Sequence, residues 1–233
     1  MQKVIILTTI ALLTLANATC AQPNLLWSRI FGGEEAEDCR AVIQTRDGGF
    51  ALAGWTESFG EGGSDFWLIV TDDEGQMLWS QTYGGEGDDR CHAILQTEDG
   101  DFVLAGYTES FGEGGRDYWA IRVNDQGDVI WSQTFGGAED EECNAIIETA
   151  EGGFALAGNT ASFEERGEGG EGNNYWLVET DADGEQLRAQ AYHFGVDDRC
   201  NSILQRPQGG FEMGGTINML NNRLDYKFSM MTS

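Results

Sequence analysis

The chain has 233 residues, enough for one sizeable domain or two small ones. Its 40 acidic and 13 basic residues give a net charge of −27, which would repel a phosphate backbone and argues against nucleic acid as a partner. The 33 glycines, with 7 Trp and 12 Phe, indicate tight turns between short aromatic strands rather than disorder. A surface so acidic and so poor in lysine is also what adaptation to high salt would produce.

Residues 1–21 have the pattern of a secretory signal peptide: a short positive start, an apolar run and then small residues. We expect cleavage between Ala18 and Gln22 and a mature protein that is secreted, periplasmic or at the cell surface. Lipoprotein anchoring at Cys20 is an alternative, which Asn17–Thr19 disfavour because they do not match a lipid-attachment motif. No later apolar run is long enough to span a bilayer.

Residues 24–31, NLLWSRIF, are expected to form a single strand ahead of the first repeat. The same pattern returns as MLWSQTY and VIWSQTF, each time at the end of a repeat unit. The N-terminal segment is therefore the closing strand of a unit whose other strands do not precede it.

A repeat of 52 residues follows. CRAVIQTRDGGFALAGWT, from Cys39, returns in related form from Cys91, Cys143 and Cys200, and the third interval is 57 residues because one loop is longer. The units are about 34–85, 86–137, 138–195 and 196–233, the last completed by 24–33.

Four strand-like runs make up the first unit. They are residues 39–45, 50–56, 65–71 and 76–83. Each is bounded by Gly, Asp or Asn and is too short for a helix. Four short antiparallel strands at a period near 50 are typical of a β-propeller blade. We therefore expect an all-β fold, with residues 22–233 forming one β-propeller domain of four four-stranded blades.

The last unit stops at YKFSMM, residues 226–231, which resembles the third strand of a unit. We expect strand 24–31 to pair with it, complete the last blade and close the ring, which would remove an exposed sheet edge. The alternative to this monomer is a dimer in which two chains form one ring of eight blades.

The repeated motif, which runs from DGGF through LAG, SFG and DFWLI to WS and YGG, resembles a repeat of roughly 52 residues in exported bacterial and archaeal proteins. The resemblance covers nearly all of the chain after residue 21 and implies a β-propeller. It implies no catalytic residue, because most members of that family have no assigned function. The fourth unit departs most, with HFGVDD in place of YGGEGDD.

The loops after the second and fourth strands should emerge on one face, because the strands of a blade alternate in direction. These loops hold more than half of the acidic residues, including those of the repeated SFGEGG. Such a concentration of like charge costs stability, which indicates a use such as binding Ca²⁺ through carboxylate and carbonyl oxygens. The alternative is a solvated, salt-adapted rim whose glycines serve only turns.

The candidate residues of this face fall into two groups. The candidate metal ligands, for Ca²⁺, are Asp65, Asp88, Asp89, Asp117, Asp140, Asp197 and Asp198. The candidate ligand-binding residues are Trp55, Tyr107, Glu61, Glu113 and Glu168. The pieces TDDEGQ, NDQGDV and TDADGE resemble Ca²⁺ loops only faintly, and we interpret them as hairpin turns.

Cys39, Cys91, Cys143 and Cys200 hold the same position in the four units, and three interpretations compete: buried free thiols, two disulfides and a Cys₄ metal site. Equivalent positions on neighbouring blades should exceed the roughly 7 Å Cα limit of a disulfide. The paired C-x₂-C spacing of structural zinc is absent. Packed thiols are therefore favoured. The recurring aromatic pairs, such as Phe66-Trp67, are likewise interpreted as packing between blades, with sugar stacking as the alternative.

Together these patterns predict a secreted, non-catalytic binding module whose acidic loop face meets divalent cations, a basic protein or a glycan. One alternative is a carboxylate-based hydrolase or lyase acting at the mouth of the channel. Another is a salt-adapted structural surface protein. Signs of an enzyme are weak, because His92 and His193 stand at unlike positions of the repeat and neither belongs to a nucleophile–base motif.

Overall fold

The computed structural model describes residues 25–163, 172–219 and 223–231, with side chains described as far as Asn218. These residues contain fifteen β-strands. None of them belongs to a helix long and apolar enough to cross a membrane. The expected signal peptide, Cys20 and Glu168 lie outside the described residues.

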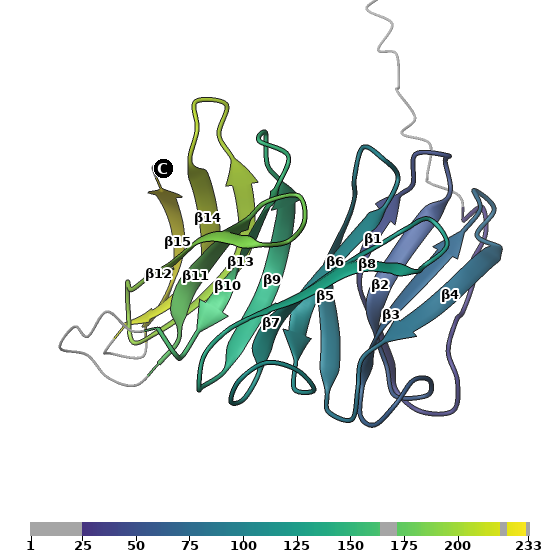
Figure 1. Cartoon of the computed structure of the whole chain (residues 1–233), viewed down its shortest axis with the longest axis horizontal. Helices are drawn as coiled ribbons and strands as arrows, with labels where there is room; N and C mark the ends of the chain where they lie inside the picture. Colours follow the sequence, from purple (N-terminus) through teal and green to yellow (C-terminus); the bar gives the residue numbers. More distant parts are fainter. Residues whose placement is uncertain (1–24, 164–171, 220–222, 232–233) are drawn as a thin grey trace, which may run out of the picture.

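The strands form four antiparallel sheets that stand side by side in chain order (Figure 1). Sheet 1 contains β1 (Glu37–Gln44), β2 (Phe50–Thr56), β3 (Asp65–Thr71) and β4 (Met77–Tyr83). Sheet 2 contains β5 (Asp89–Gln96), β6 (Phe102–Thr108), β7 (Asp117–Val123) and β8 (Val129–Phe135). Sheet 3 contains β9 (Glu141–Glu148), β10 (Phe154–Thr160), β11 (Asn174–Thr180) and β12 (Gln186–Tyr192). Sheet 4 contains β13 (Asp197–Gln205), β14 (Phe211–Met219) and β15 (Arg223–Met231).

The all-β prediction is confirmed, and so is the four-stranded unit in sheets 1 to 3. The turns between third and fourth strands are hairpin turns, as predicted. In sheet 1 the Asp72 carboxylate accepts the backbone N–H groups of Glu74 at 3.0 Å and Gln76 at 2.7 Å, while Gly75 has a φ of 73°. Asp and Gly at these positions therefore serve the turn itself.

Each sheet has two apolar faces, which we call the leading face (toward the preceding sheet) and the trailing face (toward the next). Between sheets 1 and 2, one buried cluster joins trailing residues such as Phe66 and Leu68 to leading residues such as Cys91 and Leu104. Equivalent clusters lie between sheets 2 and 3 and between sheets 3 and 4. The core is therefore divided among the three junctions rather than gathered at one centre.

The recurring tryptophans pack between sheets, as predicted. Trp79 of β4 lies 6.2 Å from Phe102 of β6, measured between ring centroids, and Trp131 of β8 lies 5.8 Å from Phe154 of β10. A tilted or edge-on arrangement at this distance is a favourable aromatic contact. The outermost strands β4 and β8 therefore each cover the leading face of the next sheet.

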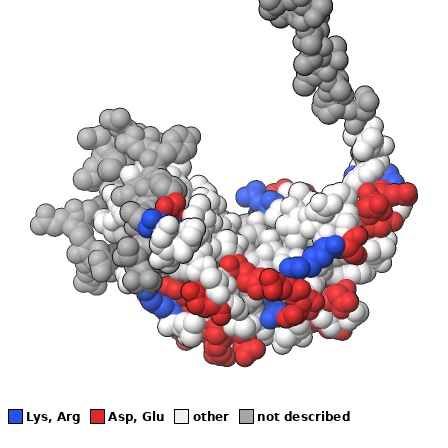
Figure 2. Space-filling model, turned by 90° about the horizontal axis from the view of Figure 1, so that it is seen from above, with Lys and Arg blue, Asp and Glu red and all other residues white. Residues whose placement is uncertain are grey.

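The four sheets form an open arc, and no closed ring is seen among the described residues (Figures 1 and 2). Neighbouring sheets pack together, but sheet 4 shares no comparable interface with sheet 1. Contrary to the expectation from the sequence, residues 25–31 form no strand and do not pair with β15. They lie instead against sheet 1, where Trp27 contacts Phe50 at 5.7 Å. Trp27 thus occupies on sheet 1 the place that Trp79 takes on sheet 2, which holds the segment at the end of the arc remote from sheet 4.

The four cysteines are free, in agreement with the favoured interpretation. Cys91, Cys143 and Cys200 are fully buried, and burial raises the pKa of the Cys91 thiol to about 12. Cys39 is exposed because, among the described residues, no sheet packs on the leading face of sheet 1.

Candidate functional site

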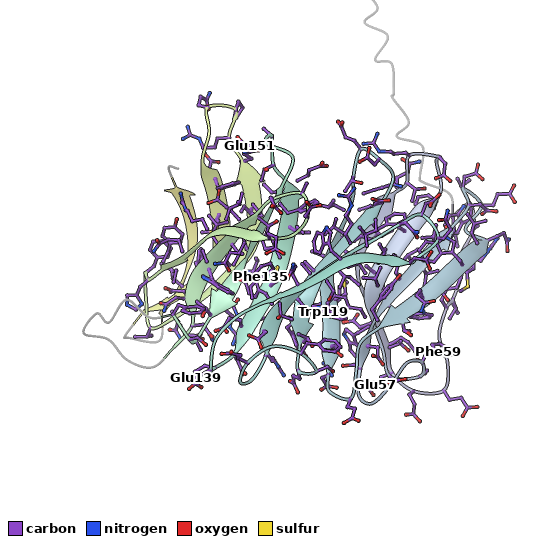
Figure 3. The ribbon with its side chains drawn as sticks, in the orientation of Figure 1. Glu57, Phe59, Trp119, Phe135, Glu139 and Glu151 are labelled. Carbon is purple, nitrogen blue, oxygen red and sulfur yellow. The ribbon has the colours of Figure 1, made fainter. Side chains whose placement is uncertain are left out.

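The expected clustering of loops at one end of the sheets is observed. We call the loop rim the loops between second and third strands together with the connections between sheets. Figure 3 shows Glu57, Phe59 and Glu139 at this end and Glu151 at the opposite end. Figure 2, which looks onto the opposite end, shows carboxylates there as well. Negative charge alone therefore does not single out the loop rim.

The candidate metal ligands Asp65 and Asp117 are buried, and each holds its own loop through a hydrogen bond. Asp65 accepts the Glu61 N–H at 2.9 Å, and Asp117 accepts the Glu113 N–H at 2.8 Å. Both aspartates are 1% exposed. A short polar side chain that accepts nearby backbone N–H groups is a common means of fixing a glycine-rich loop.

Asp88, Asp140 and Asp197 join each connection to the loop of the preceding sheet. Asp88 Oδ1 accepts the Ser64 N–H at 2.9 Å. Asp140 Oδ1 accepts the Arg116 N–H at 3.0 Å, and Asp197 Oδ1 accepts from Asn173 Nδ2 at 2.9 Å. These carboxylates are used in holding neighbouring sheets together at the rim.

Asp89 and Asp198 close the connections themselves. Asp89 accepts the Gly85 N–H at 2.8 Å, and Asp198 accepts the Gly195 N–H at 2.9 Å. Within the described ranges, no group of three or more His, Cys, Asp or Glu is placed to hold a metal ion. The expected Ca²⁺ ligands therefore form no such site in this part of the chain.

Two pairs of buried carboxyl groups lie beneath the rim. Asp65 and Asp89 both approach Gly84, so that the Asp89 carboxylate is 2.7 Å from where a Cβ on this glycine would stand. Burial, followed by the negative charge of Asp89, raises the pKa of Asp65 to about 6. Asp117 has a pKa of about 6 for the same reasons, with Glu141 as its negative neighbour. With both members of each pair at most 1% exposed, these groups are withdrawn from any dissolved substrate.

Half-exposed phenylalanines recur along the loop rim. Phe59, Phe111 and Phe163 are 45%, 44% and 41% exposed. Each ring rests against a tryptophan of its own sheet, at 5.5, 5.3 and 5.1 Å between centroids. The support fixes the orientation of each phenylalanine and leaves part of its ring open to solvent.

The repeated Gly-Gly between sheets has its explanation here. A Cβ on Gly33 would stand 3.2 Å from the Phe59 ring and would overlap the Ser58 side chain. Gly85 has the same relation to Phe111, at 3.3 Å. These phenylalanines were not predicted, because SFGEGG was interpreted through its Glu and Gly residues. The signal was the Phe at the same place in all three copies of this loop.

Exposed glutamates flank the first two phenylalanines. Glu57 and Glu61 stand on either side of Phe59, and Glu109 and Glu113 on either side of Phe111. Glu57 lies 3.9 Å from Arg90, and Glu109 accepts a 2.8 Å hydrogen bond from Arg116. Among the ion pairs of the described residues, none involves Glu61 or Glu113. Their charges therefore remain available to a partner.

The predicted ligand-binding aromatics are covered by these same arginines. Arg90 lies over the Trp55 ring at 4.3 Å, and Arg116 lies over the Tyr107 ring at 4.4 Å. Tyr107 is only 3% exposed. Tyr107 was a candidate because it ends a strand beside the acidic loops, and the arginine of the following loop folds back over it.

Two equivalent grooves adjoin the phenylalanine–tryptophan pairs. One, of about 500 Å³, is lined by Phe59, Trp67 and Gln81 among others. The other, of about 530 Å³, is lined by residues that include Phe163 and Gln190. Each combines an aromatic wall with side-chain amides, which suits a polar ligand with apolar faces.

A separate hollow lies where the innermost strands meet. Arg40, His92, Asn144 and Asn201 line a cavity of about 260 Å³. All four are the extra residues of β-bulges in β1, β5, β9 and β13. A bulge redirects a side chain out of the regular alternation, which brings these polar groups into one hollow.

Hydrogen bonds link the hollow to the following sheets. His92 Nδ1 lies 3.1 Å from the Cys143 carbonyl oxygen, and Asn144 Nδ2 donates to that of Cys200 at 2.9 Å. Burial lowers the pKa of His92. The hollow is polar, and the acid pairs beneath the rim are not among its lining residues.

No protein-family model matches the chain, and no similar sequence is found among curated proteins.

Proposed function

We propose that this chain is an exported, non-catalytic binding module that uses its loop rim to bind a basic segment of a partner protein. The single observation that carries the proposal is the repeated arrangement of a half-exposed phenylalanine between two exposed glutamates. We also assign the fold to the β-propellers, since four-stranded antiparallel sheets stand side by side at the expected period. A ring would be completed where residues 25–31 meet the free edge of β15, in the same chain or in a second copy.

A guanidinium or ammonium group fits this arrangement. The face of a phenylalanine attracts a cation, and an adjacent carboxylate adds an ion pair. Exposed cation–π contacts and exposed ion pairs each contribute about 0.5–1 kcal/mol. One such position is weak, but Phe59 and Phe111 offer two on one rigid rim, and simultaneous binding multiplies their effect.

The hydrogen bonds that Asp65 and Asp117 accept beneath the rim favour binding of this kind. The Glu61 and Glu113 backbones are held by Asp65 and Asp117, so the loops need little ordering when a partner arrives. The same use of the aspartates counts against divalent cations as the ligand. The withdrawn acid pairs likewise offer no support to a carboxylate-based hydrolase or lyase.

A glycan is the second candidate, favoured by the two grooves beside Phe59 and Phe163. Their aromatic walls and the amides of Gln81 and Gln190 are suited to the apolar faces and hydroxyl groups of a sugar. A salt-adapted surface with no partner is the third possibility, and the carboxylates at both ends of the sheets agree with it.

Calorimetric titration with an oligo-arginine peptide tests the proposal. The double variant Glu61→Gln/Glu113→Gln should weaken binding about tenfold, which corresponds to about 1.4 kcal/mol. Phe59→Ala/Phe111→Ala should have a similar effect. The control is Asp73→Asn/Asp125→Asn, which removes the same charge from exposed turns of the same two sheets at the opposite end and should change affinity less than twofold.

Equal weakening by the rim and control charge variants would mean diffuse charge attraction and would contradict the proposal. If a neutral oligosaccharide bound instead, and Gln81→Ala removed that binding, the glycan candidate would replace it.

A further inference from the structure

The junctions between sheets are built alike. In two of the three, the outermost strand of a sheet places a tryptophan on the second-strand phenylalanine of the next sheet, as Trp79 does on Phe102 and Trp131 on Phe154. In the third, β12 has Arg188 at this position, but an equivalent buried cluster joins the two sheets. The leading face of the next sheet is then buried. In sheet 2 this buries Cys91 completely and leaves Ile94 only 8% exposed.

Sheet 1 shows the same leading face without a sheet against it. Val42, which corresponds to Ile94, is 62% exposed, and Cys39 is exposed where Cys91 is buried. A cavity of about 300 Å³ opens here, with Leu52 and Ile69 in its lining. In sheets 2 and 3 the leading face packs against the preceding sheet. Sheet 1 has the equivalent apolar residues on its leading face, but no sheet of the described residues covers them.

Residues 25–31 identify what belongs on this face. Trp27 contacts Phe50 and stands over Gly75, as Trp79 contacts Phe102 and stands over Gly127. The segment is therefore placed as the outermost strand of a preceding sheet, yet in the part of the chain that the structure describes it pairs with no sheet. Ile30 is 95% exposed.

Sheet 4 has the complementary deficiency. Its outer strand β15 has no neighbour on its free side among the described residues. Leu204 on its trailing face is 47% exposed, whereas the corresponding Ile43, Leu95 and Ile147 pack against the sheet that follows. Glu212 replaces an apolar residue there and lies 3.4 Å from Arg206. Sheet 4 thus offers three strands and a trailing face, and residues 25–31 offer the fourth strand.

The two ends do not meet within one chain. Figure 1 shows sheet 1 and sheet 4 at opposite ends of the arc. Since an equivalent buried cluster fills each of the three junctions, a ring of four sheets would require each of them to bend further. A second copy can meet both ends with every junction unchanged.

We propose that two copies of this chain join head to tail at both ends and form a ring of eight sheets. Residues 25–31 of each copy pair with β15 of the other, and the leading face of sheet 1 packs on the trailing face of the other copy's sheet 4. The two-fold arrangement closes on itself, so no free face remains for further growth. The hollow lined by Arg40 and His92 becomes half of a channel that the second copy completes.

Sedimentation of the purified protein provides the first test. The wild-type protein should sediment as a dimer at micromolar concentration. Val42→Asp and Leu204→Asp, from opposite ends of the arc, should each sediment as folded monomers, as judged by cooperative unfolding. Ile30→Asp serves the same purpose if Val42→Asp does not fold. Leu187→Asp, at an exposed position of an outer strand away from both ends, should remain a dimer.

A mixing experiment distinguishes a second copy from closure within one chain. Each interface needs one intact leading face and one intact trailing face, so neither Val42→Asp nor Leu204→Asp can form one alone. A mixture of the two variants retains one intact interface and should recover dimers. In Leu204→Asp, Cys39 should react with a thiol reagent at least tenfold faster than in the wild-type protein.

A wild-type protein that is monomeric at all concentrations would overturn the proposal, as would open-ended oligomers. Failure of the mixture to form dimers would also overturn it.

Discussion

Asp65 and Glu61 lie four residues apart in one loop and have opposite roles. Asp65 is buried and accepts the Glu61 N–H, whereas the Glu61 side chain is exposed without an ion pair in the described residues. Environment therefore divides the acidic residues into internal ties and surface groups. The sequence does not reveal this division, because both kinds are acids in glycine-rich loops.

The buried carboxyl groups of Asp65 and Asp117 should make the stability of the fold depend on pH. The pKa values of Asp65 and Asp117 rise from 3.8 to about 6 on folding, so the folded state holds protons that the unfolded state has lost. Stability should therefore fall as the pH rises from about 4 through 6. Below pH 4 the direction reverses, because hydrogen bonds from Ser58 and Ser64 lower the pKa values of Glu37 and Asp88.

Melting temperatures at pH 5 and pH 7 check this expectation. The wild-type protein should melt at a higher temperature at pH 5, and Asp65→Asn/Asp117→Asn should lose most of the difference. An amide is compatible with the site, because Asn174 takes this position in sheet 3 and its side-chain oxygen lies 2.7 Å from His193 Nδ1. An equal pH response in the variant would show that other groups cause it.

At the scale of the strand, the bulge in each inner strand requires a glycine in the strand beside it. A Cβ on Gly106 would overlap the Arg90 carbonyl oxygen, and Gly54 has the same relation to Asp38. The repeated Ala-Gly of the second strand therefore follows from the bulges that carry His92 and Arg40 into the hollow.

Gly106→Ala should lower the free energy of unfolding by about 2–3 kcal/mol, because backbone rather than a movable side chain blocks the new methyl group. Gly100→Ala is the control: this glycine has a φ of 95° but nothing within 4 Å of the new Cβ. It should cost about 1 kcal/mol from backbone strain alone. Denaturant unfolding measures both, and equal losses would mean that the overlap is relieved at no cost.

Local features of the fold were predictable from the sequence. Strand boundaries, hairpin turns and inter-sheet packing of tryptophans all follow from residue patterns within one repeat. The position of residues 25–31 was not predictable from the sequence. Their pattern identifies the kind of strand, but the angle between neighbouring sheets decides which sheet edge the segment can reach. The burial of Tyr107 was not predictable either, because the arginine that covers it lies nine residues further along the chain, in the following loop.

For the whole molecule, position on a rigid frame rather than total charge defines the candidate site. Carboxylates occupy both ends of the sheets (Figures 2 and 3), but the repeated phenylalanines lie at one end only among the described residues. A partner that recognised negative charge alone would bind at both ends of the sheets. A partner that needs an aromatic face beside a carboxylate would bind the loop rim.

Hydrogen exchange with and without the oligo-arginine peptide shows which end of the sheets the peptide contacts. We expect slower exchange in the rim loops, residues 57–63 and 109–115, and unchanged exchange in the opposite turns, residues 72–75 and 124–127. Equal slowing at both ends, or slowing confined to the opposite turns, would contradict this expectation.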